Sequence, residues 1–164
     1  MKVRNVLLAA VVTLSLPLAA QQPAAPAPIP QYGANITLDQ AKYVAAAAEA
    51  EAKKNGWPMA IAIVDTAGHL VYFQRGDNTQ TGSTLVSQDK AASAAMFRRA
   101  GKALQDQVAA GGAGLRYLVL RGAVPIDGGL PISIDGKIVG GIGVSGMAGD
   151  QDAVVAKAGT DALK

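Results

Sequence analysis

The segment DGGLPISIDGKIVGGIGVSG, residues Asp127–Gly146, decides the fold class of this 164-residue chain. Two runs of alternating apolar residues flank the dipeptide Asp135-Gly136. An Asp-Gly pair between such runs is the strongest short-range signal for a β-hairpin. The second run ends among closely spaced glycines and leads to Gly149-Asp150, where the acidic residue favours the start of a helix. The segment therefore predicts a hairpin followed by a helix.

Three further strands are predicted upstream of this hairpin. Residues 59–64 (MAIAIV) are continuously apolar, Asp65–Gly68 supplies a tight turn, and 70–75 (LVYFQR) forms the returning strand. A strand is also predicted at Leu115–Leu120. Twelve of the nineteen glycines lie between Gly111 and Gly149, which indicates tight turns and close backbone approach throughout that region.

Helices are predicted before, between and after these strands. Thr37–Gln40 fits a capping box at the start of an alanine-rich helix that ends at Gly56. A second helix begins at Ser83 or Thr84 and is broken or kinked near Gly101, and Asp150 opens the last one. The order is α-β-β-α-β-β-β-α. Short connections then make a mostly antiparallel five-stranded sheet with helices packed on it, an α+β fold.

The N-terminal residues predict export. Lys2 and Arg4 precede an apolar run over 6–16, and small residues follow up to Ala20, as in a cleaved secretory signal peptide. The run is too short for a stable membrane span, and no lipidation cysteine follows it. We therefore expect a periplasmic or secreted protein. The expected boundaries are a signal peptide at 1–20, a Pro/Ala-rich linker at 21–35 and the domain at 36–164.

Composition excludes several classes of partner and site. Without Lys2 and Arg4 the formal charge falls from +3 to +1, with 13 basic and 12 acidic residues, so nucleic acid is not an expected partner. The chain has no cysteine, and its core must form without disulfides. The residues after Ala20 suffice for one domain with its own core.

Two motif matches are set aside. Gly141–Gly146 reads G-x-G-x-x-G, but a dinucleotide site also needs a further strand that ends in an acidic residue. Close packing of a helix on the strand explains these glycines better. Ser87–Lys90 matches the S-x-x-K of penicillin-recognising enzymes, but the companion S-D-N and K-T-G elements are absent.

Six elements of the sequence form a recognisable set: Asp65-x-x-Gly68-x-Leu70, Arg75-Gly76-Asp77-Asn78, Lys90-Ala91, Gly128-Gly129-Leu130-Pro131-Ile132, Ile142–Gly146 and the closing helix Gly149–Gly159. Through these elements the sequence resembles the GlcG/HbpS-like family over about residues 37–163. One element departs from the family pattern, because R-G-D-N replaces an R-M-D-G-like form. That loop has lost a methionine and gained an asparagine.

The resemblance implies a function as well as a fold. It implies haem binding or, as an alternative, corrinoid binding, in a homo-oligomer whose ligand pocket lies near a subunit interface. The family includes haem binders, corrinoid-linked domains and proteins of glycolate-utilisation operons, so membership alone does not fix the function.

His69, the only histidine, is the candidate metal ligand. One interpretation leaves it exposed at the start of a strand, and the other makes it an axial ligand of haem iron. A second ligand would be Met147, Met96, a tyrosine, water or a residue of another subunit. Zinc or non-haem iron is not expected, because cysteine is absent and no carboxylate pair flanks His69 at ligand spacing.

Cationic side chains are candidates to pair with haem propionates. They are Arg75, Lys90, Arg98, Arg99, Lys102, Arg116 and Arg121. Arg98, Arg99 and Lys102 are interpreted as a solvated helix face. Arg75 is of more interest, because it ends a strand beside a polar loop that contains Asp77. The predicted ligand-binding residues are His69, Arg75, Asp77, Lys90 and Met147.

Three functions remain open at this point. The first is an exported tetrapyrrole-binding protein for scavenging, storage or sensing. The second is an enzyme that degrades haem or converts a small molecule, with Lys90, Asp77 or His69 as acid or base. The third is an accessory module that docks on a membrane sensor or transporter. The first leads, because the sequence shows no convincing nucleophile, paired carboxylates or metal cluster.

Overall fold

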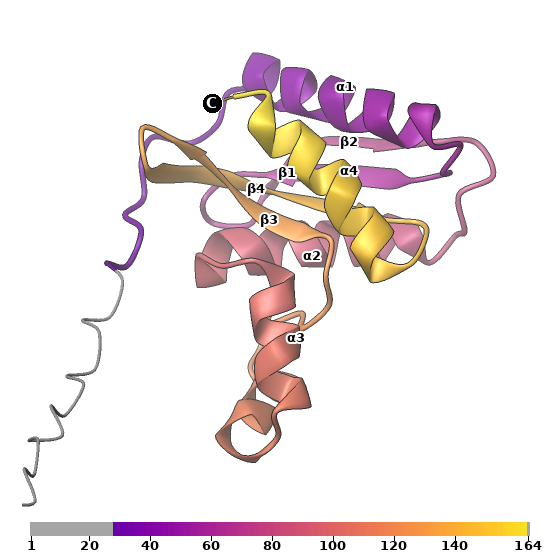
Figure 1. Cartoon of the computed structure of the whole chain (residues 1–164). Coiled ribbons are helices and arrows are strands. Elements are labelled where there is room, and N and C mark those ends of the chain that lie inside the picture. Colours follow the sequence, from indigo (N-terminus) through magenta and orange to yellow (C-terminus); the bar gives the residue numbers. More distant parts are fainter. Residues whose placement is uncertain (1–27, 164) are drawn as a thin grey trace, which may run out of the picture.

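A four-stranded antiparallel sheet forms the middle layer of the computed structural model, which describes residues 28–163 (Figure 1). The strand order is β2-β1-β4-β3. The strands are β1 (Ala60–Val64), β2 (Leu70–Arg75), β3 (Gly129–Ile134) and β4 (Lys137–Ser145). The helices are α1 (Leu38–Lys54), α2 (Ser83–Phe97), α3 (Gly101–Ala109) and α4 (Gly149–Asp161), with a 3-10 helix η1 (Gly112–Leu118). The predicted α+β class and both hairpins are confirmed, but the prediction of five strands is wrong.

The strand predicted at 115–120 is instead part of η1 and the turn after it. Gly111 has a φ of 72°, and a Cβ at Gly114 would lie 1.8 Å from the carbonyl oxygen of Gln107, so this segment folds back tightly against α3. Leu118 and Val119 are 62% and 84% exposed. Their apolar character resembles that of a strand, but α3 and η1 form an arm that projects away from the sheet (Figure 1).

The helix ends follow the sequence signals closely. The Thr37 Oγ1 atom accepts a hydrogen bond from the Gln40 N–H at 3.3 Å, and the Gln40 Oε1 atom accepts one from the Thr37 N–H at 2.9 Å. This confirms the capping box. The predicted break near Gly101 is also confirmed, because α2 ends at Phe97 and Arg98 has a left-handed φ of 54°.

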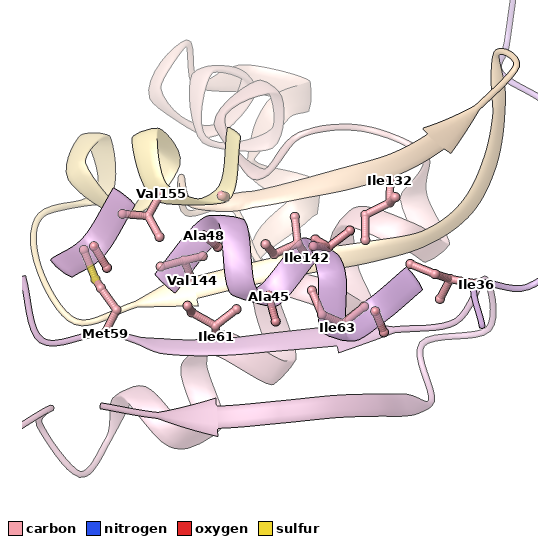
Figure 2. Close-up of a cluster of buried hydrophobic side chains, with 14 of the residues drawn as sticks. Ile36, Ala45, Ala48, Met59, Ile61, Ile63, Ile132, Ile142, Val144 and Val155 are labelled. Carbon is pink, nitrogen blue, oxygen red and sulfur yellow. The ribbon is translucent and has the colours of Figure 1, made fainter. Parts of the chain in front are cut away.

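The helices α1 and α4 cover one face of the sheet (Figure 1). Large aliphatic side chains fill the space between this helical layer and the sheet (Figure 2). Ile61 and Ile63 of β1 point to this side, as do Ile142 and Val144 of β4. The helices contribute smaller residues, namely Ala41, Val44, Ala45, Ala48, Ala52, Val155 and Ala156. Burial of these side chains supplies most of the hydrophobic stabilisation of the fold.

On the opposite face of the sheet, the backbone of β4 lies directly against the backbone of α2. A Cβ at Gly143 would lie 2.0 Å from the Ser87 carbonyl oxygen, and one at Gly141 would lie 2.5 Å from that of Ala91. The glycines of the G-x-G-x-x-G match at 141 and 143 therefore allow a helix to lie against the strand, as the sequence indicated. The helix in question is α2, which precedes the strand, and not α4, which follows it.

The segment just before α1 runs beside β4. The Ile138 N–H donates to the Gln31 carbonyl at 2.8 Å, and the Gly33 N–H donates to the Ile138 carbonyl at 2.8 Å. The Tyr32 hydroxyl donates to the carbonyl of Met96 at the end of α2. The contacts of the domain thus extend into residues 31–35 of the predicted linker. The predicted signal peptide lies outside the described residues.

Candidate functional site

The five predicted ligand-binding residues lie at three separate places. His69 is in the turn between β1 and β2, whereas Arg75 is the last residue of β2 and Asp77 follows it. The two ends of β2 are about 17 Å apart, at about 3.3 Å per residue of strand. Lys90 and Met147 lie near the buried carboxylate of Asp152. One small-molecule site in a single subunit therefore does not include all five.

His69 is held by a carboxylate. The Oδ1 atom of Asp65 accepts hydrogen bonds from the backbone N–H groups of Ala67 and His69, both at 2.9 Å, and its Oδ2 atom lies 3.2 Å from the His69 Nδ1 atom. A carboxylate only accepts, so Nδ1 carries the proton, and in the neutral imidazole Nε2 keeps a free lone pair. The imidazole is 81% exposed and is therefore accessible to a ligand.

The Asp65 carboxyl is stabilised in its charged form. Partial burial favours a higher pKa, but the two backbone N–H donors and the His69 ring outweigh it, and the net pKa of Asp65 is below its ordinary value. The D-x-x-G element thus has a structural role, because Asp65 closes the turn. It also orients the imidazole of His69.

Met96 is the methionine next to the His69 turn. A Cβ at Gly68 would lie 3.3 Å from the Met96 Sδ atom, and the Met96 side chain is 41% exposed. Met96 also lines a cavity of about 500 Å³ at the C-terminal end of α2, here called the α2-end cavity. Its lining residues are Pro28, Ile29, Pro30, Met96, Phe97, Arg98, Arg99 and Ala103. The sequence offered both Met147 and Met96 as second ligands and placed Met147 among the binding residues, but Met147 follows the end of β4 that lies away from the His69 turn.

Two arginines give the α2-end cavity a positive charge. The Arg98 Nη1 atom donates to the Pro30 carbonyl at 3.2 Å, and its guanidinium lies 5.2 Å from the centre of the Tyr32 ring. The Arg99 Nη1 atom donates to the Tyr117 hydroxyl at 3.3 Å. Neither arginine forms an ion pair with a carboxylate among residues 28–163. Both arginines follow the end of α2 at Phe97, and both line the cavity.

Lys90 forms a buried ion pair. Its Nζ atom donates to Asp152 Oδ2 at 2.7 Å and to the Val144 carbonyl at 3.0 Å, and both charged side chains are at most 3% exposed. Burial raises the pKa of the Asp152 carboxyl above its ordinary value, although Lys90 and the Met147 N–H oppose the shift. The pair joins α2, β4 and α4. The Lys90 ammonium has internal partners and lines none of the cavities described.

Asp77 lines a second cavity, of about 450 Å³, between the end of α1 and the loop after β2. We call it the Trp57 cleft after its one aromatic residue. Asp77 is thus the only predicted ligand-binding residue that lines one of the described cavities. Arg75 immediately precedes this loop at the end of β2.

The described part of the chain contains neither a metal-binding cluster nor a membrane-spanning helix. Residues 28–163 contain no group of three or more His, Cys, Asp or Glu side chains that could hold a metal ion. No helix among them is long and apolar enough to cross a membrane.

Comparison with known proteins identifies the family. The model of the family described as "Haem degrading protein HbpS-like" matches residues 36–161. The chain belongs to the HbpS-like family. Protein GlcG of Escherichia coli K12 is 37% identical over 110 residues, which cover 67% of this chain and 81% of GlcG.

Solved structures of HbpS-like proteins have the same fold. A double mutant of Streptomyces reticuli HbpS superposes with a TM-score of 0.74 at 28% identity, over 93% of this chain and 99% of HbpS. A complex of PduOC with heme superposes with a TM-score of 0.72 at 25% identity, over 79% of this chain and 96% of PduOC. The predicted membership of the GlcG/HbpS-like family is therefore confirmed.

Sequence reasoning missed Asp152 as the partner of Lys90. Both residues belong to elements that carried the resemblance, the Lys-Ala pair and the closing helix. A buried lysine needs a buried acid, but the sequence offers several acids and does not state which one folds against α2. The Asp65–His69 pair could have been found, because the carboxylate and the imidazole lie four residues apart within one predicted turn.

Proposed function

We propose that this HbpS-like protein is an exported haem-binding protein and that His69 supplies an axial nitrogen to the haem iron. The Asp65–His69 pair is the observation that carries this proposal. Histidines that ligate metals almost always donate their other ring N–H to a carboxylate, carbonyl or water, and Asp65 accepts from Nδ1 in this way. Nε2 is then free to bind iron.

The residues near His69 fit a haem. The α2-end cavity offers apolar contact from Ile29 and Phe97 and cations from Arg98 and Arg99 for propionates. Met96, which lies between this cavity and the His69 turn, offers a thioether as a second candidate ligand. When bound, haem would supply redox and ligand-binding chemistry at its iron. The chain itself would hold and orient the group and shield one of its faces.

The heme complex of PduOC supports this choice of ligand, since PduOC shares the fold at 25% identity. A corrinoid is the alternative tetrapyrrole. The protein would scavenge, store or sense its ligand. An accessory module that docks on a membrane sensor or transporter is a separate alternative. Haem degradation is the second candidate function, and the description of the family as haem-degrading favours it.

We also propose a homo-oligomer that forms through the arm of α3 and η1. Leu115, Leu118 and Val119 are at least 49% exposed on this arm. Adjacent exposed apolar side chains mark interaction surfaces in soluble proteins. Light scattering after size exclusion would test this, since Leu118→Glu should lower the mass toward that of a monomer. An unchanged mass would place the interface elsewhere.

The main test is a titration with hemin, and in parallel with cobalamin, followed by the visible spectrum. The wild type should give a sharp, saturable Soret band at one hemin per chain, and His69→Ala should lose it. Arg99→Ala should weaken binding, whereas Lys102→Ala removes a cation of α3 that lines no described cavity and should bind like the wild type.

The outcomes separate the candidate functions. Retention of the same band in His69→Ala would keep haem binding but exclude His69 as the ligand. Saturable binding of cobalamin alone would favour the corrinoid. Loss of the Soret band under air with ascorbate, at rates that exceed those of free hemin, would show haem degradation.

Export is tested separately by sequencing the N-terminus of the protein recovered from the periplasm or medium. Cleavage after Ala20 predicts that the mature chain begins at Gln21. Recovery of the uncleaved chain from the cytoplasm would contradict export and leave the haem proposal unaffected.

A further inference from the structure

The Trp57 cleft has an apolar floor. Ala52, Met59 and Ile61 line it, and each is at most 4% exposed. The partly buried indole of Trp57 forms one wall. The volume of about 450 Å³ lies within the range of about 300–1,000 Å³ that is usual for small-molecule sites. The cleft therefore has room for a small organic molecule with an apolar group.

The charges around the cleft leave an unpaired carboxylate. Lys53 and Glu49 form an ion pair at 2.8 Å, and the Gln74 side chain also donates to Glu49. These contacts lower the pKa of Glu49, and the hydrogen bond from Lys53 has the largest effect. Glu49 and Lys53 thus neutralise each other. No residue of the described part of the chain forms an ion pair with Asp77. The lining side chains therefore carry a net negative charge.

The end of α1 adds to this negative potential. The residues of its last turn, Ala52 and Lys53, line the cleft, as does Gly56 just beyond the helix. The C-terminal end of a helix carries a partial negative charge that favours cations. This contribution comes from the backbone and is independent of Asp77.

The loop that carries Asp77 is fixed in place. The Gly76 N–H donates to the Met59 carbonyl at 2.9 Å, and the Thr79 hydroxyl, buried within the loop, donates to the Gly76 carbonyl at 2.8 Å. Asn78 has a left-handed φ of 59°, a conformation that asparagine tolerates better than most residues. This explains the asparagine of R-G-D-N, and it holds Asp77 at the edge of the cleft in advance of binding.

We propose that the Trp57 cleft binds a small organic cation, a protonated amine that carries an aromatic or aliphatic group. The ammonium would pair with Asp77 at the end of α1, and the apolar group would lie on Ile61 and beside Trp57. An indole is also the best side chain for contact with a cation. This site is separate from the proposed haem site, which lies at the other end of β1 and β2.

Trp57 is the only tryptophan of the chain, so intrinsic fluorescence reports on the cleft directly. We would titrate the protein with phenethylamine at pH 7 and, as probes of matched shape, with 3-phenylpropionate and 2-phenylethanol. Phenethylamine should produce a saturable change in the Trp57 fluorescence. The anion and the alcohol should bind at least about fivefold more weakly, because neither can form the partly exposed ion pair with Asp77.

Two variants make the test specific. Asp77→Asn keeps the size of the side chain but removes its charge. It should lower the affinity for phenethylamine about fivefold. Asp150→Asn removes an exposed acid of α4 that lines no described cavity and should leave binding unchanged. The proposal is overturned if the anion binds as well as the amine, if Asp77→Asn has no effect, or if no probe saturates.

Discussion

The two faces of β4 are covered in opposite ways, and the adjacent residues Ile142 and Gly143 show the difference. Ile142 is fully buried among the side chains of the layer of α1 and α4 (Figure 2). Gly143 faces α2 so closely that a Cβ would lie 2.0 Å from a backbone oxygen. One face is held by side-chain volume and the other by direct approach of two backbones.

The close face also contains most of the buried polar groups. Ser83 and Ser145 share a hydrogen bond at 3.0 Å, and Lys90 and Asp152 form their ion pair beside Gly128. Small and polar residues thus fix α2 in one position, whereas aliphatic packing on the other face tolerates small changes in shape. The fixed α2 in turn places Met96 and the two arginines at the end of the sheet where His69 lies.

The largest effect is expected from Lys90→Met. Removal of the ammonium leaves the Asp152 carboxylate and the Val144 carbonyl buried without their cation, which should cost about 3–5 kcal/mol of unfolding free energy. Denaturant unfolding measures this. The double variant Lys90→Met/Asp152→Asn should recover part of the loss, because no buried charge remains. Equal stability of the single and double variants would show that the charge of Asp152 is not the cause.

Gly143→Ala should lower the unfolding free energy by about 3 kcal/mol, because its methyl group would meet the backbone of α2. This value lies at the upper end of the usual range for overpacked cores. Gly82→Ala is the matched control, since a Cβ at Gly82 has no neighbour within 4 Å and its φ is −61°. The control should change stability by less than about 1 kcal/mol. Similar losses in both variants would contradict the close contact between α2 and β4.

Ile142→Val should cost only about 1 kcal/mol, since it removes one methylene from the aliphatic face. Thermal or denaturant unfolding would measure the change. The comparison between the faces requires that this loss be clearly smaller than that of Gly143→Ala, one residue along the strand. A loss of about 3 kcal/mol would mean that both faces are equally intolerant of change.

Asp65→Asn should give the smallest loss, on the order of 1 kcal/mol of unfolding free energy at pH 7, because the amide oxygen still accepts the two backbone hydrogen bonds and only the bond from His69 is lost. The pKa of Asp65 is lower in the folded state than in the unfolded chain. Its contribution is therefore complete above the ordinary carboxyl pKa of about 3.9 and is lost as the pH falls through the folded pKa. The stability difference between wild type and variant should shrink below about pH 4. A constant difference from pH 7 to pH 3 would show that the charge of Asp65 does not stabilise the turn.

Local signals predicted much of the fold. The Asp135-Gly136 turn, the capping box of Thr37 and Gln40 and the break before Gly101 each depend on residues close in sequence, and all three are found in the structure. The prediction of a strand at 115–120 was wrong. The segment is apolar, but its close contact with α3 makes it part of a 3-10 helix and the turn that follows. Periodicity alone cannot separate a buried strand from an exposed apolar arm.

The candidate site was less predictable, because its parts meet only after folding. The pairing of His69 with Asp65 is local, but the approach of Met96 to the same turn depends on how α2 lies on the sheet. Arg98 and Arg99 were interpreted as a solvated helix face, but both line the α2-end cavity, which residues 28–30 far away in the sequence help to form. The separation of Asp77 from His69, in contrast, could have been predicted, because the strand expected at 70–75 lies between them.

The most direct test of the account is the resonance Raman spectrum of the ferric hemin complex of His69→Ala, recorded before and after addition of imidazole. The variant should lack histidine ligation, and free imidazole should restore the spectrum of the wild type. A variant that keeps the wild-type ligation spectrum without imidazole would contradict the assignment of His69 as the haem ligand.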